Sequence, residues 1–281
     1  MRRMTPHGRG RIGLLALLVV GALASLLATA SLASAAPELG RCVQVEGKLE
    51  GKKTVFNGGY KSKNCRHSSP TKTGKFEWLP GPGEEKTFES GQEGSALLET
   101  TSGIKITCPT AQKFGEFTGA TTEKLKFVMA GCEEVATKAI CTTEVPEEEE
   151  LPIEGIIRSN KLTGELGLVE GEKKVGWQVK PEAGSVIASF ECGAKLTGKQ
   201  YVLEGSYTNR IRRTNKMTEE TFEVYKQSGG LQKPSGFTGG PATNMSAKYL
   251  SGLELITEPI GLQVLEEAFF EEELEYRVSS S

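Results

Sequence analysis

The chain has 281 residues, with 34 lysines and arginines against 36 acidic residues and six cysteines. Every acidic residue is glutamate, and the only histidines are His7 and His67. The lack of aspartate excludes EF-hands and Asp-rich calcium repeats, whose short loops need compact carboxylates, and it excludes the two-Asp protease dyad. With so few histidines, a zinc site built on two of them is excluded once the first segment is removed. We therefore expect no metal and no cofactor.

Residues 1–35 are predicted to be a secretory signal peptide. Four arginines precede an apolar run from Leu14 to Ala30, and Ala33-Ser34-Ala35 then fits the small-x-small rule of signal peptidases. One alternative is an uncleaved membrane anchor, for which the run is short. The other is a lipoprotein, which Arg41 before Cys42 disfavours. Cleavage after Ala35 predicts a secreted, extracellular chain that does not stay in the membrane.

Cleavage makes the chain clearly acidic. The removed segment carries four arginines and no glutamate, so 30 basic and 36 acidic residues remain. A negative surface disfavours nucleic acid as a partner.

The six cysteines all lie beyond the predicted cleavage site, and an even number in an exported chain indicates disulfides. Cys42 and Cys65 bracket a segment rich in Gly and Lys, and Cys132 and Cys141 suit the two ends of a hairpin. Cys108 and Cys192 each end an alternating run on its apolar face, which would let them join two strands. The expected pairs are therefore Cys42–Cys65, Cys132–Cys141 and Cys108–Cys192.

Short runs of alternating apolar and polar residues, separated by Gly-rich turns, predict an all-β fold with little helix. Leu125, Phe127 and Met129 alternate with Lys124, Lys126 and Val128. Phe222 and Val224 alternate with Thr221, Glu223 and Tyr225 in a second run. The number of runs exceeds that of one immunoglobulin-like sandwich. We expect a large antiparallel β-sandwich, or two β-lobes sharing a sheet, held by disulfides. Residues 262–276 fit either a helix or a strand, and the alternation at their end favours a strand.

Three regions follow from these patterns. Residues 1–35 are the signal peptide, residues 36–80 form an N-terminal β segment stapled by a disulfide, and residues 81–281 form the main β domain. A faint similarity between the segments that follow Cys108 and Cys192 leaves open that the main domain holds two similar β units.

Few residues suggest a chemical site. His67 follows Cys65 in a polar stretch typical of an exposed loop, so we expect it to be no catalytic base. Alternation places Trp78 and Trp177 on core faces rather than on a binding surface. The basic stretch 210–216 and the acidic stretch 144–151 fit solvated surface better than a ligand site.

One resemblance rests on a series of short motifs. In order, these are CVQVEG, GKFEWLPGPG, ALLETTSGIKITC, GEFTG, FVMAGCEE, LTGELG and SFECG. Together they resemble an uncharacterised family of secreted, cysteine-containing β-rich proteins of high-GC Gram-positive soil bacteria. The motifs consist of strands, turns and cysteines, so the resemblance implies an exported, disulfide-bonded β fold and assigns no catalytic residue.

The function that these features favour is non-enzymatic. We expect an extracellular or cell-envelope binding or structural protein, with a cell-wall or polysaccharide surface as its partner. The alternative is an extracellular hydrolase of the glycosidase type, which would use a pair of glutamates. No residue pattern marks such a pair.

Overall fold

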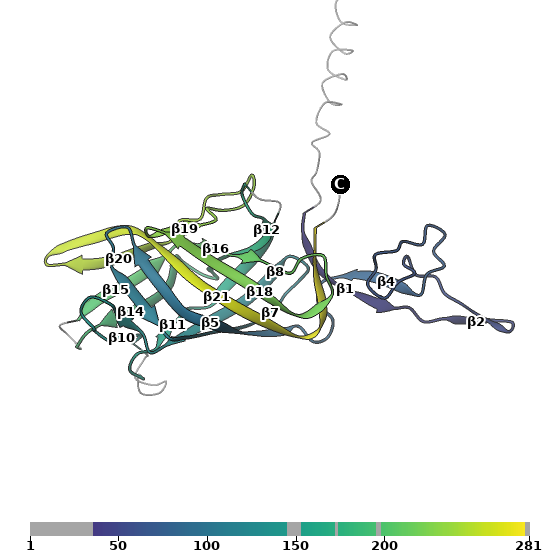
Figure 1. The fold of residues 1–281 in the computed structure, drawn as a ribbon, viewed down its shortest axis with the longest axis horizontal. Helices are drawn as coiled ribbons and strands as arrows, with labels where there is room; N and C mark the ends of the chain where they lie inside the picture. Colours follow the sequence, from purple (N-terminus) through teal and green to yellow (C-terminus); the bar gives the residue numbers. More distant parts are fainter. Residues whose placement is uncertain (1–35, 145–152, 172–173, 195–197, 279–281) are drawn as a thin grey trace, which may run out of the picture. The chain divides into compact units, whose positions relative to one another are not determined.

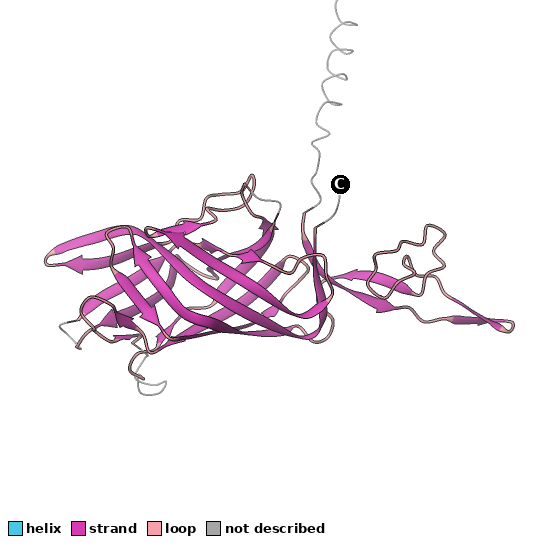
Figure 2. Cartoon of the chain, viewed as in Figure 1, coloured by secondary structure: helices cyan, strands magenta, loops and turns pink. Residues whose placement is uncertain are grey.

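A computed structural model describes residues 36–144, 153–171, 174–194 and 198–278. The predicted signal peptide and nearly all of the acidic stretch lie outside these ranges. Strands dominate the described residues, which contain no helix, so the predicted all-β fold is confirmed (Figure 2).

Ala36–Ser280 is one compact unit. The strands are β1 (Glu38–Gln44), β2 (Lys48–Glu50), β3 (Lys53–Val55), β4 (Phe76–Pro80), β5 (Thr87–Thr100), β6 (Lys105–Cys108), β7 (Thr110–Phe117), β8 (Thr122–Ala130), β9 (Glu133–Glu134), β10 (Cys141–Thr142), β11 (Ile157–Arg158), β12 (Leu162–Leu168), β13 (Val175–Pro181), β14 (Val186–Cys192), β15 (Lys199–Glu204), β16 (Tyr207–Thr208), β17 (Arg210–Ile211), β18 (Thr218–Ser228), β19 (Leu231–Lys233), β20 (Ser246–Ser251) and β21 (Glu254–Arg277).

Nineteen of these strands form one antiparallel sheet that curls until it closes on itself. The pairings run from β21 through β5, β7, β8, β12 and β13 to β16. After Asn209 the chain continues as β17, which pairs with β18, and β18 returns to β21. Eight antiparallel segments therefore enclose an interior, when β16 and β17 are counted as one segment of the ring. Asn209 lies between β16 and β17.

The long strand β21 connects the separate parts of this sheet (Figure 1). Its first residues pair with β20, which continues through β15 and β14 to β10. Its middle lies between β5 and β18, and its end pairs with β1. Residues 262–276 are thus strand, as the alternation at their end favours.

Apolar and aromatic side chains fill the interior of the closed ring. Phe117 contacts three other rings, with centroid distances of 4.8 Å to Phe88, 5.7 Å to Phe270 and 6.1 Å to Trp177. Trp177 is fully buried, so its predicted core role is confirmed. On β8, Leu125 and Met129 are buried while Lys124 and Lys126, on either side of Leu125, are exposed, which follows from the two-residue period of a strand.

The N-terminal segment joins the sheet through β1. This strand pairs with β4 over Gly40–Gln44, and its first residues pair with the end of β21. The chain between β1 and β4 contains the small β2–β3 hairpin and a loop that the Cys42–Cys65 disulfide holds, as predicted.

The other two predicted disulfides are wrong. Cys108 pairs with Cys132, and Cys141 pairs with Cys192. Cys132 and Cys141 do bracket a hairpin, because the Cys141 amide donates to the Cys132 carbonyl at 2.9 Å. Their side chains nevertheless bond to neighbouring strands: β9 lies beside β6, which brings Cys132 to Cys108, and β10 lies beside β14 with Cys141 directly opposite Cys192.

Candidate functional site

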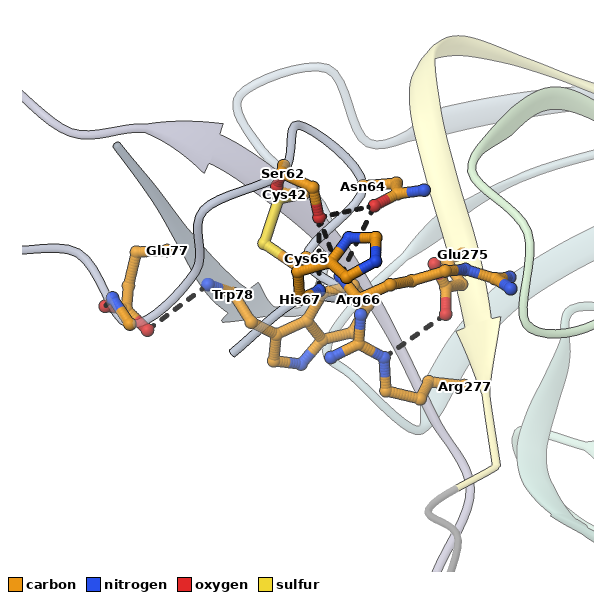
Figure 3. Close-up of a disulfide and its surroundings, with 11 residues drawn as sticks. Cys42, Ser62, Asn64, Cys65, Arg66, His67, Glu77, Trp78, Glu275 and Arg277 are labelled. Atoms are coloured by element: carbon orange, nitrogen blue, oxygen red, sulfur yellow. Dashed lines mark hydrogen bonds and ion pairs between the residues drawn. A yellow bond between two sulfur atoms is a disulfide. The ribbon is translucent and has the colours of Figure 1, made fainter. Parts of the chain in front are cut away.

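The residues that the sequence singles out do not form one site. His67 is exposed in a loop two residues after the Cys42–Cys65 disulfide, where its backbone amide donates to Ser62 Oγ at 3.1 Å (Figure 3). Its position confirms the predicted loop histidine.

The prediction that Trp78 lies on a core face is wrong, because this side chain is only half-buried and lies outside the core. It sits on β4, where the guanidinium of Arg277 lies 3.4 Å from its ring centroid (Figure 3). Its indole Nε1 donates to Glu38 at 2.7 Å. The alternation of β4 does place Trp78 on the same face as Phe76, but the side chain of Trp78 contacts Glu38 of β1 and Arg277 of β21 rather than the enclosed interior.

The basic stretch 210–216 is divided between different environments. Ile211 between its arginines is buried, and Arg213 forms an ion pair with Glu220 and lies over the ring of Phe222. Asn215 turns the chain in a left-handed conformation with φ 55°. The stretch therefore consists of the short strand β17 followed by a turn.

An open surface groove of about 940 Å³ lies on the outside of the ring, and we call it the outer groove. It crosses β21, β5, β7 and β8. The strand register places Phe269, Glu89 and Phe114 side by side in one row, with Lys126 next in line. Phe269 and Phe114 are 47% and 42% exposed, which is unusual for phenylalanine. Because they lie two strands apart, their backbones are separated by about 9.5 Å.

Charges of both signs surround these two rings. The groove is lined by Lys124, Lys126 and Lys161 and by Glu89, Glu116, Glu182 and Glu271. Lys124 binds Glu182 at 2.5 Å, and Thr87 donates to Glu271 at 2.7 Å. The groove therefore offers an almost neutral floor that combines aromatic faces with many hydrogen-bonding groups.

Glu271, which lines the outer groove, forms a carboxyl pair with Glu85, which does not line it. A hydrogen bond with Glu271, followed by the charge of that neighbour, raises the pKa of Glu85. The hydrogen bond from Thr87 is the first cause that lowers the pKa of Glu271. The two groups thus bind a proton with different strengths.

The interior of the ring contains a buried polar cluster that no sequence pattern predicted. Its members are Lys113 on β7, Glu123 on β8, Asn209 between β16 and β17, Glu223 and Tyr225 on β18, and Glu266 on β21. Lys113 and Glu223 are 2% and 1% exposed. The sequence offered one indication of the cluster, the two-residue period of a strand. In TFEVY, Thr221 and Glu223 share a face with Tyr225, and in the structure this face points inward.

Hydrogen bonds in the cluster converge on one oxygen. Glu223 Oε2 accepts from Lys113 Nζ at 2.5 Å, from the side-chain amide of Asn209 at 2.5 Å, and from the Tyr225 hydroxyl at 2.9 Å. The other end of the Asn209 amide is also held, because the backbone amide of Trp177 donates to its Oδ1 at 2.7 Å. Asn209 is therefore fixed in position and in orientation.

The two remaining carboxyls of the cluster, those of Glu266 and Glu123, have fewer hydrogen bonds and more distant positive charge than Glu223. Lys113 Nζ lies 3.6 Å from Glu266, which also accepts from Ser90 at 3.2 Å. Neither oxygen of Glu123 has a hydrogen-bond partner among the described residues. Burial is the main cause that raises the pKa of both Glu123 and Glu266. Burial would lower the pKa of Lys113, but the charges of Glu223, Glu266 and Glu123 outweigh it and raise that pKa.

The cluster is closed to anything larger than water. The cavity beside Lys113 and Glu266 has a volume of about 20 Å³, and apolar side chains such as Ala111 and Leu262 form most of its wall. Such a space is enough for one water molecule. A sugar or peptide therefore has no access to the buried glutamates.

A second well-connected carboxylate lies on β21 opposite Ala247, at the base of the β20–β21 hairpin and beside the β5–β6 turn. Glu258 accepts hydrogen bonds from the hydroxyls of Tyr249, Thr101 and Ser102 and from the Ser102 amide. Partial burial by itself would raise the pKa of Glu258, but these donors lower it to about 2.

Comparisons with known proteins add no family to this description. No family model matches the chain, and neither the curated proteins nor the solved structures give a match. Within the described residues, no helix has the length and apolar character to span a membrane. The same residues contain no group of three or more His, Cys or Glu side chains placed to hold a metal ion.

Proposed function

We propose that this chain is an exported, non-enzymatic protein that binds a polysaccharide in the outer groove. The observation that carries the proposal is the row of Phe269, Glu89 and Phe114, in which two exposed rings lie on three adjacent, rigid strands. Aromatic faces on a fixed scaffold suit the apolar faces of sugar rings, and flanking charged groups can accept and donate hydrogen bonds to hydroxyls.

The charge of the outer groove supports a neutral, polar ligand. Three lysines and four glutamates line it, so neither a polyanion nor a polycation finds a matching field. The spacing of the two rings favours a ligand that repeats along its length, because each ring can then contact a separate unit. Three disulfides are consistent with an oxidising location, where cell-wall and capsular polysaccharides occur.

Binding of the mature protein to soluble polysaccharides and to insoluble cell-wall fractions tests the proposal. We expect retention by at least one neutral polysaccharide, and we expect the double variant F114A/F269A to weaken it about tenfold or more, which corresponds to about 1.4 kcal/mol. L255A is the matched control, because Leu255 is also an exposed side chain of β21 but lies outside the outer groove. Equal binding by the folded double variant and the wild type would refute this use of the groove.

The hydrolase alternative keeps one supporting observation. Glu85 and Glu271 differ in their affinity for a proton, as an acid and its partner carboxylate do in glycosidases, but their shared hydrogen bond holds them closer than the roughly 5 Å or more that separates such a pair, so they would have to move apart to act on a sugar. Release of reducing sugar ends by the wild type, abolished in E271Q, would favour this alternative over simple binding.

A further inference from the structure

Lys113 and Asn209 meet in the interior of the ring at a place where a covalent bond between them is chemically accessible. Both donate to the same oxygen, Glu223 Oε2, at 2.5 Å, so Lys113 Nζ and Asn209 Nδ2 are at most about 5 Å apart. Asn209 is fully buried and Lys113 nearly so. An amine, a carboxamide and a carboxyl group that links them are the parts needed for acyl transfer from one nitrogen to another.

We propose that Lys113 and Asn209 become joined by an intramolecular amide bond that the folded chain forms by itself. The Lys113 Nζ attacks Cγ of Asn209, the Nζ–Cγ bond forms, and the Cγ–Nδ2 bond breaks. Glu223 takes a proton from Nζ and passes a proton to Nδ2, which leaves as ammonia. No electron is transferred and no other reactant is required.

The Asn209 carbonyl is prepared for this attack. The backbone amide of Trp177 donates to Oδ1 at 2.7 Å, which places a fixed donor where negative charge develops in the tetrahedral intermediate. Gly176, next to Trp177, lets this part of β13 approach Asn209 closely, because a Cβ at that position would lie 2.0 Å from the backbone carbonyl oxygen of Asn209. The enclosed interior also limits the water that could hydrolyse the amide instead.

The lysine must lose its proton before it can attack, and Glu223 is the base within reach. Transfer of the proton along the 2.5 Å hydrogen bond turns a buried ion pair into a neutral amine and a neutral acid, which a low-dielectric interior tolerates. The neighbouring carboxyls favour the charged lysine, so the neutral form is scarce and the reaction slow. A slow step is sufficient, because each molecule reacts only once.

Bond formation requires Nζ to come within about 3–3.5 Å of Cγ. The four-carbon stem of lysine is flexible enough for this movement, whereas the hydrogen bonds from Trp177 and to Glu223 hold the asparagine still. Asn209 is a better acyl donor than Glu223, because ammonia leaves an amide whereas a carboxylate resists attack by an amine.

The position of the proposed bond gives it a structural purpose. It would connect β7 to the junction of β16 and β17, where the ring closes through two short pairings instead of one continuous ladder. The three disulfides of the described residues lie elsewhere, at the N-terminal loop, between β6 and the β8–β9 turn, and between β10 and β14. The amide would therefore fasten the part of the ring that no disulfide holds.

Intact-mass measurement of the secreted, disulfide-reduced protein tests the proposal. We expect a mass lower than that of the chain after signal-peptide cleavage by one ammonia molecule, and a proteolytic digest that contains one branched peptide with Lys113 joined to Asn209. The full mass of that cleaved chain, without the loss of ammonia, would overturn the proposal. So would the loss of one water with a Lys113–Glu223 link, or the loss of ammonia with unlinked peptides, which indicates a succinimide at Asn209.

Three variants separate the chemistry from the packing. K113M and N209A are each expected to keep the full mass, and E223Q is expected to do so as well because it cannot carry the proton. K226Q changes an exposed lysine on the same strand as Glu223 and should keep the loss of ammonia. Because the decisive mass is that of the wild type, a variant that fails to fold leaves the test intact.

Discussion

The arrangement of the disulfides can be tested through the stability of three double variants. In the chain-entropy model, closing the 51-residue loop between Cys141 and Cys192 stabilises the fold by about 4 kcal/mol. The 24-residue loop between Cys108 and Cys132 contributes about 3.5 kcal/mol. C141A/C192A and C108A/C132A each remove one bridge, so they should lower the free energy of unfolding by about 4 and about 3.5 kcal/mol, respectively.

The third variant, C132A/C141A, gives the sharpest contrast. It breaks two bridges at once in this structure and should lower the free energy of unfolding by about 7.5 kcal/mol. If Cys132 were instead bonded to Cys141, the same variant would lose only one short bridge, worth about 2.5 kcal/mol, and would be the least destabilised of the three. Urea unfolding monitored by fluorescence and by circular dichroism, under oxidising conditions, measures the free energies. If C132A/C141A is the most stable of the three variants, the disulfide assignment is refuted.

Two further predictions concern single residues. The hydrogen bonds to Glu258 lower its pKa from 4.5 to about 2, so their contribution to stability is complete above about pH 5 and is lost as the pH falls from about 4.5 through about 2. E258Q should therefore lower the free energy of unfolding by about 1 kcal/mol at pH 7, a value already reduced for solvent screening. If E258Q differs from the wild type by the same amount at pH 2 as at pH 7 in urea unfolding, this prediction is wrong. G164A should lower the free energy of unfolding by about 1–3 kcal/mol, because its Cβ would lie 2.5 Å from a carboxyl oxygen of buried Glu123. Thermal unfolding measures the effect, and G91A is the control, because a Cβ at that position meets nothing within 4 Å.

The sequence predicts the strands better than it predicts what they enclose. On β8 the apolar residues mark the inward face correctly, because Leu125 and Met129 are buried. On β18 the same rule would select Phe222 and Val224, yet the face turned to the ring interior carries Thr221, Glu223 and Tyr225. Charged residues are rarely buried, so an inward glutamate is visible only once its partner Lys113 is known to lie across the ring.

The disulfides show the same limit. Local spacing correctly placed Cys132 and Cys141 at the two ends of a hairpin, and it correctly paired Cys42 with Cys65. It could not say which strands lie beside that hairpin, and these neighbours decide the remaining bonds. The outer groove is equally a product of register, because Phe114 and Phe269 become neighbours only through β5 between them.

The order of the strands along the chain has a consequence for biosynthesis. β21 follows all of its partners in the sequence, and it fills the space between β5 and β18. Until it has been made, both of those strands have an unpaired edge, and such edges invite pairing with other chains. A nascent chain that ends before residue 254 would therefore be prone to aggregate, and the time between the synthesis of β18 and β21 is when a chaperone would be most useful.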